Sequence, residues 1–78
     1  MLPVSYSESD QKLLKSFGAR VKRQRRRRGL SQEEIAFRSG LHRTYVGSVE
    51  RGERNVALLS IRKLAKALEC TPGDLLRR

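Results

Sequence analysis

The stretch GLSQEEIAFRSGLHRTYVGSVERG, residues 29–52, decides the fold of this chain. It contains Ser31 and, three residues later, Glu34. This is the capping-box pattern, in which the serine oxygen caps a new helix and the glutamate bonds back to the cap. Gly40 can adopt the left-handed backbone conformation that ends a helix, so the first helix of this stretch should be short. Another helix is expected directly after it, over residues 42–51. The stretch therefore predicts two short helices joined by a tight turn.

Helices are also expected on both sides of this stretch. The first begins at Ser9 or Asp10, which are good N-cap residues, and Gly29 ends it. The last begins where Thr71 caps the chain and Pro72 takes the first helical position. Apolar residues at helical spacing place these flanking helices over residues 10–28, 58–68 and 72–76, with a loop over residues 53–56.

The expected fold class is all-α, with five short helices around one small core. No segment shows the period-two alternation of strands, and no internal repeat is visible. Gly18 weakens the pattern of the first helix without ending it. A chain of 78 residues has room for one domain. We expect a flexible N-terminal arm over residues 1–9 and a helical domain over residues 10–78.

The charge of the chain favours a polyanionic partner. Eighteen Lys and Arg residues against eight Asp and Glu give a net charge of +10 and a pI near 11.1. Nucleic acid is the commonest partner of such a protein. Groove-reading helices suit B-form DNA better than A-form RNA, so double-stranded DNA is the expected ligand.

Several classes of site are not expected in this chain. Cys70 is the single cysteine and His42 the single histidine, which excludes a disulfide and a four-ligand zinc site. No catalytic constellation or phosphate-binding glycine loop is visible, so we expect neither an enzyme nor a cofactor or small-molecule substrate. No apolar run is long enough to span a membrane, and no signal peptide is visible. A cytoplasmic location is therefore expected.

The helix predicted over residues 42–51 has a surface suited to the major groove of DNA. Val46 and Val49 point toward the core when the segment is projected at 100° per residue. Tyr45 lies at the edge, and two roles stay open for it: packing inward or touching a phosphate. A second arc carries mostly short side chains, which let a helix approach base edges closely: Arg43, Thr44, Gly47 and Ser48. Arg43 itself could contact a base, hold a phosphate or remain solvated.

Taken together, these motifs resemble the Cro/repressor-type (XRE) helix-turn-helix regulators. The resemblance covers about residues 13 to 76 and implies a lambda-repressor-like DNA-binding domain. Residues 42–55 resemble, more closely, the controller proteins of restriction–modification systems. The stretches that carry the family resemblance are Arg20–Lys22, Gly29–Ala36, Ser39–Leu41, Tyr45–Val46, Glu50–Gly52 and Leu64–Leu68.

The resemblance also implies roles for individual residues. Gln32 matches the glutamine at a helix N-terminus that grips a DNA phosphate. Glu50 matches the acidic residue that pairs with an arginine of the first helix, here Arg25, as a structural ion pair. The remaining predicted DNA contacts are Arg43, Thr44, Tyr45, Ser48, Arg51, Arg54 and Asn55.

A homodimer is expected, because Leu75 and Leu76 lie on a last helix too short to bury both in its own core. Two-fold symmetry implies a pseudo-palindromic operator. The resulting prediction is a sequence-specific transcriptional regulator, of the controller type and acting at its own promoter. The alternative is an antitoxin-type or prophage repressor whose main partner is a protein. A contact with RNA polymerase, with Glu33 and Glu34 as candidates, is left open.

Overall fold

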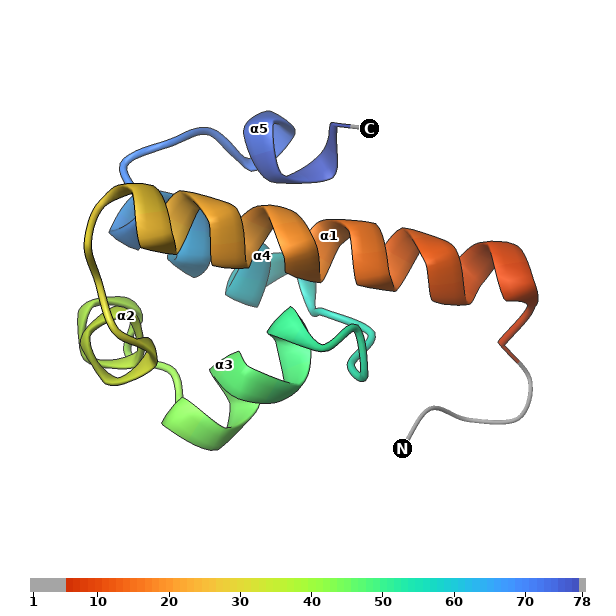
Figure 1. The fold of residues 1–78 in the computed structure, drawn as a ribbon, viewed down its shortest axis with the longest axis horizontal. Helices are drawn as coiled ribbons and strands as arrows, with labels where there is room; N and C mark the ends of the chain where they lie inside the picture. Colours follow the sequence, from red (N-terminus) through yellow and green to blue (C-terminus); the bar gives the residue numbers. More distant parts are fainter. Residues whose placement is uncertain (1–5, 78) are drawn as a thin grey trace.

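The computed structural model describes residues 6–77 as five helices, and no strand occurs in that range. The expected all-α, five-helix fold class is thereby confirmed. The helices follow one another with short connections (Figure 1): α1 (Glu8–Arg27), α2 (Gln32–Ser39), α3 (Arg43–Glu50), α4 (Leu58–Ala67) and α5 (Pro72–Leu76). None of the described helices is both long and apolar enough to cross a membrane.

The first helix begins earlier than predicted. Its N-cap is Ser7, whose Oγ accepts a hydrogen bond from the backbone N–H of Asp10 at 3.1 Å. The Asp10 carboxylate accepts in turn from the Ser7 N–H at 3.3 Å, so the pair forms a capping box. The prediction of Ser9 or Asp10 as the cap is therefore wrong, since a shorter aspartate fills the place usually taken by glutamate. Residues 1–5 of the expected arm lie outside the described residues.

The predicted helix–turn–helix boundaries are confirmed. The Glu34 N–H donates to Ser31 Oγ at 3.0 Å, and the Glu34 carboxylate accepts from the Ser31 N–H at 2.8 Å. Gly40 ends α2 in the left-handed conformation, with φ of 73°. His42 occupies the N-cap of α3 without a side-chain cap bond. Only three residues separate the two helices, which places them at a sharp angle, as Figure 1 shows.

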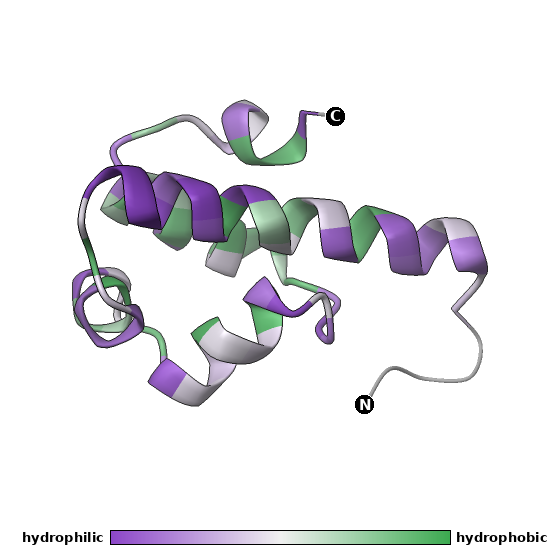
Figure 2. Ribbon diagram, in the orientation of Figure 1, coloured by the Kyte–Doolittle hydropathy of each residue, from purple (hydrophilic) through white to green (hydrophobic). Residues whose placement is uncertain are grey.

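One apolar core joins all five helices. In Figure 1, α1 crosses the molecule with α5 above it, α2 and α3 below and α4 behind. Figure 2 shows that the C-terminal half of α1 is largely hydrophilic on its visible side. The buried apolar side chains come from every helix and from the turn after α1: Phe17, Val21, Leu30, Ile35, Ala36, Val46, Val49, Leu64, Ala65, Ala67, Leu68 and Leu75.

Two glycines let α1 and α3 approach closely. A Cβ atom on Gly18 would lie 2.7 Å from the Glu50 carbonyl oxygen, closer than real Cβ contacts allow. Gly52, with φ of 76°, would place a Cβ atom 2.6 Å from Cγ of Lys15. The C-terminal end of α3 therefore rests directly on the backbone of α1. This close contact between α1 and α3 at Gly18 and Gly52, hereafter the α1–α3 seam, fixes the orientation of α3 in the molecule.

Candidate nucleic-acid interface

The accessible part of α3 is its N-terminal turn. Arg43 and Thr44 are exposed, whereas Tyr45 is half-buried and packs against the core. Residues 46–50 are all buried. Of the two roles left open for Tyr45, the structure shows inward packing. The side chains of α3 that could enter a DNA groove are therefore those of its first turn, Arg43 and Thr44.

A buried ion pair fixes the other end of α3. Arg25 Nε donates to Glu50 Oε2 at 2.7 Å, and Arg25 Nη2 donates to Glu50 Oε1 at 3.0 Å. Arg25 Nη1 donates to the Leu30 carbonyl at 2.8 Å. The hydrogen bonds that Arg25 donates to Glu50 raise the pKa of Arg25 above its ordinary value, despite the opposing effect of burial. The structure thus contains the structural pair expected between these two residues, in bidentate geometry.

Gln32 extends this pair toward the surface. Its Nε2 donates to Glu50 Oε1 at 3.0 Å, which ties the first residue of α2 to the last residue of α3. A Cβ atom on Gly47 would meet Arg51 Nη1 at 3.3 Å and Gln32 Oε1 at 3.6 Å. The missing side chain at Gly47 thus leaves room for both polar groups. Gln32 and Arg51 consequently lie together beside the α2 N-terminus, where backbone N–H groups favour an anion.

Arg51 also has an acidic neighbour. Its Nε donates to Glu53 Oε2 at 3.0 Å, and both side chains are largely exposed. The hydrogen bond raises the pKa of Arg51 and lowers that of Glu53. This pair is weak in water, so Arg51 can exchange the carboxylate for a phosphate.

Ser48 is not exposed on the surface of α3. Its side chain is buried, and its Oγ donates to the Tyr45 carbonyl at 2.7 Å. The same oxygen accepts from Arg54 Nε at 3.1 Å. The prediction of Ser48 as a base-reading residue is therefore corrected. The helical projection treated α3 alone, whereas the loop after Gly52 folds back and covers this position.

Ser48 instead positions Arg54, a role that the sequence did not reveal. The Arg54 guanidinium carbon lies 5.5 Å from the centre of the Tyr45 ring, a cation–π distance. With Nε bound to Ser48 and the plane held over Tyr45, the two terminal nitrogens remain available to a ligand. Arg54 and Asn55 are both exposed. Six residues separate Arg54 from Ser48, so no local motif predicts their bond.

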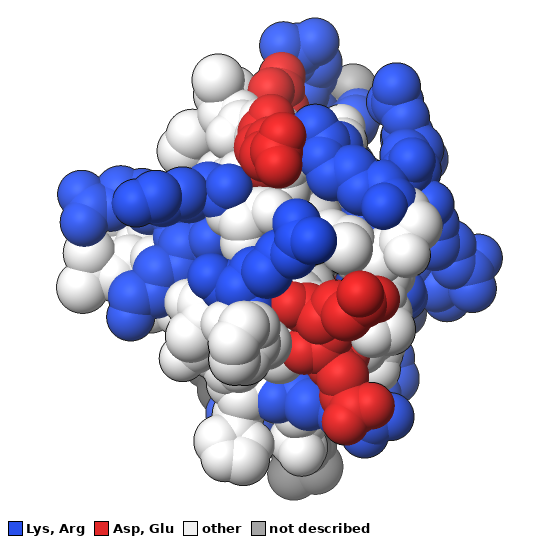
Figure 3. Space-filling view, turned by 90° about the vertical axis from the view of Figure 1, so that its left-hand side faces the viewer, with Lys and Arg blue, Asp and Glu red and all other residues white. Residues whose placement is uncertain are grey.

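Charge is uneven over the molecular surface. Figure 3 views the end at which α2 lies, and Lys and Arg side chains cover much of that face. The carboxylates collect in two groups rather than alternating with the basic residues (Figure 3). Large areas therefore present positive charge without an adjacent negative group.

The predicted dimer residues have different environments. Leu75 is fully buried in the core of its own chain, so its side chain cannot supply a contact surface, and that prediction is corrected. Leu76 is half-exposed, at 50%. Leu58 and Leu59, in the first turn of α4, are 80% and 60% exposed. The core-facing side chains of α4 come from its later turns, at Leu64, Ala65 and Ala67.

Comparison with known proteins assigns the chain to a family. The helix-turn-helix family model HTH_3 matches residues 21–75, well over half of the chain. Control protein C.BamHI of Bacillus amyloliquefaciens is 49% identical over 61 residues, covering 77% of this chain and 75% of that protein.

Solved structures give a similar result. The restriction–modification controller protein C.AhdI from Aeromonas hydrophila superposes with a TM-score of 0.78 at 56% identity, covering 80% of this chain and 94% of that one. The controller protein C.Esp1396I, as a tetramer in complex with its natural 35-base-pair operator, gives a TM-score of 0.72 at 36% identity. That match covers 76% of this chain and 78% of the other.

Proposed function

The chain belongs to the helix-turn-helix family HTH_3, and from this premise we propose that it is a restriction–modification controller that binds a pseudo-palindromic operator at its own promoter as a homodimer. Its relatives are DNA-binding regulators and not enzymes, and they do not favour the antitoxin-type alternative. The observation that carries the proposal is the pre-ordered face around α3. The buried Arg25–Glu50 pair fixes the C-terminal end of α3 and holds Gln32, and Ser48 holds Arg54.

The N-terminal turn of α3 would enter the major groove. Arg43 can donate two hydrogen bonds to a guanine edge, and Thr44 can meet a base or the thymine methyl group. Gln32 and Arg51, which lie together beside the α2 N-terminus, would hold a phosphate. Such phosphate contacts set the register of the helix in the groove, while the base contacts supply specificity.

Arg54 and Asn55 would contact DNA beyond the recognition helix. The Arg54 side chain is already oriented by Ser48 and Tyr45, so little side-chain entropy is lost on binding. We expect its terminal nitrogens to meet the backbone or the neighbouring groove. Ser48 then contributes to affinity indirectly, through the position of Arg54.

The homodimer would form through exposed leucines of α4 and α5, two helices that pack on each other. Leu58, Leu59 and Leu76 are the apolar side chains that a second copy could cover. Two-fold symmetry would place the two α3 helices about 34 Å apart, one turn of B-DNA. The operator complex of C.Esp1396I supports an oligomer on DNA.

We also propose that α2 contacts RNA polymerase. The outer side of α2 carries Glu33 beside Phe37, which is 89% exposed. This pairing of an apolar ring with a carboxylate is a candidate surface for activation. The proposed site of action is the cytoplasm, where operator DNA and polymerase are found.

Fluorescence anisotropy tests the DNA-binding proposal. DNA from upstream of the gene should bind at least about 10³-fold more tightly than shuffled DNA of equal length. About ten phosphate contacts per dimer would give a log–log salt slope near −9. Arg43→Ala should weaken cognate binding by about 1–3 kcal/mol and shuffled binding little, whereas Arg62→Ala on the exposed side of α4 should leave both unchanged. Equal losses on both DNAs would reassign Arg43 to the phosphate backbone.

Analytical ultracentrifugation tests the dimer. Leu76→Arg and Leu58→Arg should each give a folded monomer that binds operator weakly, because a charge enters an apolar contact. Phe37→Arg, which changes an even more exposed apolar residue on α2, should remain dimeric. A dimeric Leu58→Arg/Leu76→Arg protein would contradict the assignment of this interface.

A further inference from the structure

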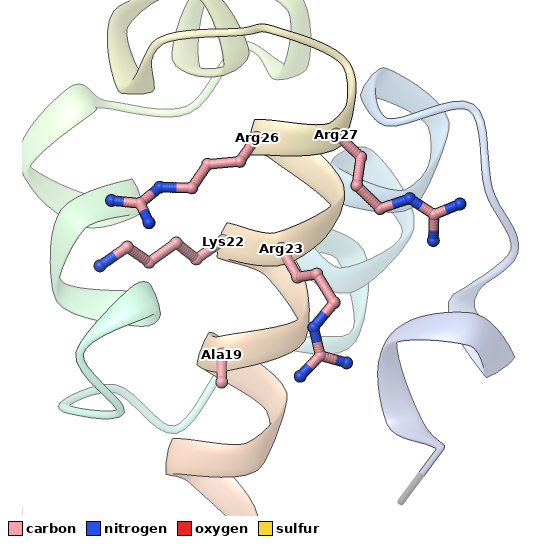
Figure 4. A pocket seen from close by; sticks show the side chains of 5 residues that line it. All are labelled: Ala19, Lys22, Arg23, Arg26 and Arg27. Atoms are coloured by element: carbon pink, nitrogen blue, oxygen red, sulfur yellow. The ribbon is translucent and has the colours of Figure 1, made fainter.

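Four basic residues form a continuous stripe on the exposed side of α1. The stripe, hereafter the outer basic face, consists of Lys22, Arg23, Arg26 and Arg27. With Ala19 they line a shallow hollow of about 500 Å³ (Figure 4). The stripe lies on the side of the helix opposite Phe17, Val21 and Arg25, which face the core.

Within the described residues, no carboxylate neutralises the positive charge of the outer basic face through an ion pair. None of its four side chains forms an ion pair there, whereas Arg25, Arg51 and Arg77 each have a carboxylate partner. The carboxylates of α1 itself lie in its first turn, at the other end of the helix. Lys22 with Arg26, and Arg23 with Arg27, are like-charge pairs four residues apart, which destabilise a helix.

The helix dipole explains only part of this arrangement. Basic groups in the last turn of a helix are favourable, and that applies to Arg26 and Arg27. Lys22 and Arg23 lie one turn earlier, where the dipole effect has fallen off. The charge that folding leaves uncompensated is therefore suited to an external anion.

The stripe extends from the side of the DNA-reading helix around the molecule. In Figure 4, Lys22 and Arg26 extend toward the side on which α3 lies, and Arg23 and Arg27 extend toward the side of α5. Half of the outer basic face is thus directed toward the helix that carries the candidate base contacts. It offers only cationic donors and no carboxylate, which is the composition that binds phosphates without reading sequence.

We propose that the outer basic face binds backbone phosphates of the operator duplex outside the half-site, so that flanking DNA bends around the side of each subunit. This inference rests on the proposed function, because α3 must first place the duplex. Bending has an elastic cost, which the added phosphate contacts offset. Because Lys22 and Arg26 extend toward the side of α3, the flank of the same duplex is favoured over a second DNA molecule or an acidic protein.

The test compares two operator duplexes. The short duplex contains the half-sites alone, about 20 base pairs, and the long duplex adds about 15 base pairs of shuffled sequence at each end. The variant is Arg23→Gln/Arg27→Gln, and the matched control is Lys63→Gln/Lys66→Gln, which removes the same charge from exposed positions of α4. Affinity is measured at several salt concentrations, and energy transfer between dyes on the duplex ends reports bending.

We expect the wild type and the control variant to bind the long duplex at least about 10-fold more tightly than the short one. The Arg23→Gln/Arg27→Gln protein should lose that advantage while binding the short duplex within about 2-fold of wild type. Its salt slope on the long duplex should be shallower by about 4, for two phosphate contacts in each of two subunits. End-to-end energy transfer on the long duplex should fall with the variant and not with the control.

Three results would overturn the proposal. These are an equal loss of affinity on both duplexes, no advantage of the long duplex with wild type, and energy transfer between two separately labelled duplexes that depends on Arg23 and Arg27. The last would assign the face to a second DNA molecule. Failure of the wild type to prefer even the short operator would overturn the proposed function itself, which separates the two conclusions.

Discussion

The two sides of α1 use the same residue type in opposite ways. Arg25 on the inner side is buried and makes three hydrogen bonds, two to Glu50 and one to the Leu30 carbonyl. Arg26 and Arg27, the next two residues, are exposed and form no ion pair among the described residues. The difference teaches that position on the helix, and not the basic run as such, separates a structural arginine from one available to a ligand.

The physical reason is desolvation. A buried guanidinium loses its water and is stable only when a carboxylate and further acceptors replace that water, as Glu50 and the Leu30 carbonyl do at Arg25. An exposed guanidinium keeps its water, and its interactions are screened by salt. Changes on the inner side should therefore affect folding, and changes on the outer side should affect binding alone.

The largest effect is expected from Glu50→Ala. Loss of the carboxylate leaves Arg25 charged and buried without its partner and removes the acceptor of Gln32. The free energy of unfolding should fall by about 3–5 kcal/mol, measured by urea denaturation. Glu33→Ala, at an exposed site on α2, should change it by less than about 0.5 kcal/mol. A Glu50→Ala protein as stable as wild type would contradict the structural role of the pair.

Gly18→Ala should have the next largest effect. Alanine favours a helix over glycine by about 1 kcal/mol, so helix propensity alone predicts a gain in stability. The added Cβ would instead press against the backbone of α3, and we expect a net loss of about 1–3 kcal/mol. Ser16→Ala, on the exposed side of α1, tests propensity without the contact and should be neutral or slightly stabilising. A more stable Gly18→Ala protein would show that α1 and α3 can move apart at the α1–α3 seam without a loss in the free energy of unfolding.

A smaller loss of stability is expected at acid pH. Hydrogen bonds from Ser31 lower the pKa of Glu34, and those from Thr71 lower the pKa of Asp74. A carboxyl with a lower pKa in the folded chain stabilises it fully above the unfolded pKa, about 4.3 for Glu and 3.9 for Asp. That contribution is lost as pH falls through the folded value.

Thermal unfolding between about pH 5 and pH 2 measures this loss. Glu34→Gln/Asp74→Asn should keep the capping bonds while reducing the decline of the melting temperature with acid. Glu33→Gln serves as the control, since among the described residues its carboxylate makes no hydrogen bond. An unchanged decline in the double variant would place the acid sensitivity elsewhere in the chain.

The smallest effect on folding is expected on the outer side of α1. Arg26→Ala should change the free energy of unfolding by less than about 0.5 kcal/mol, because the side chain makes no ion pair among the described residues. The matched comparison is Arg25→Ala, one residue earlier, which should be destabilising by several times that amount. Equal effects of these two variants in urea denaturation would remove the distinction between the two sides.

Much of the local structure was predictable from the sequence. The capping pattern at Ser31, the terminating Gly40 and the cap at Thr71 place three helix boundaries correctly. The start of α1 was missed because Asp10 completes the box at Ser7 in place of the usual glutamate. The ion pair of Arg25 with Glu50 was expected only through the family resemblance, since 25 residues separate the two side chains.

The sequence by itself determined the helices, their caps and the positive charge, because these depend on bonds within about four residues and on composition. The tertiary structure alone decided that Ser48 supports Arg54, that Leu75 is buried while Leu58 is exposed, and that Gly18 admits the α3 backbone. Each of those outcomes depends on which distant segment covers a side chain. Burial is a property of the packed molecule, and a helical projection of one element cannot supply it.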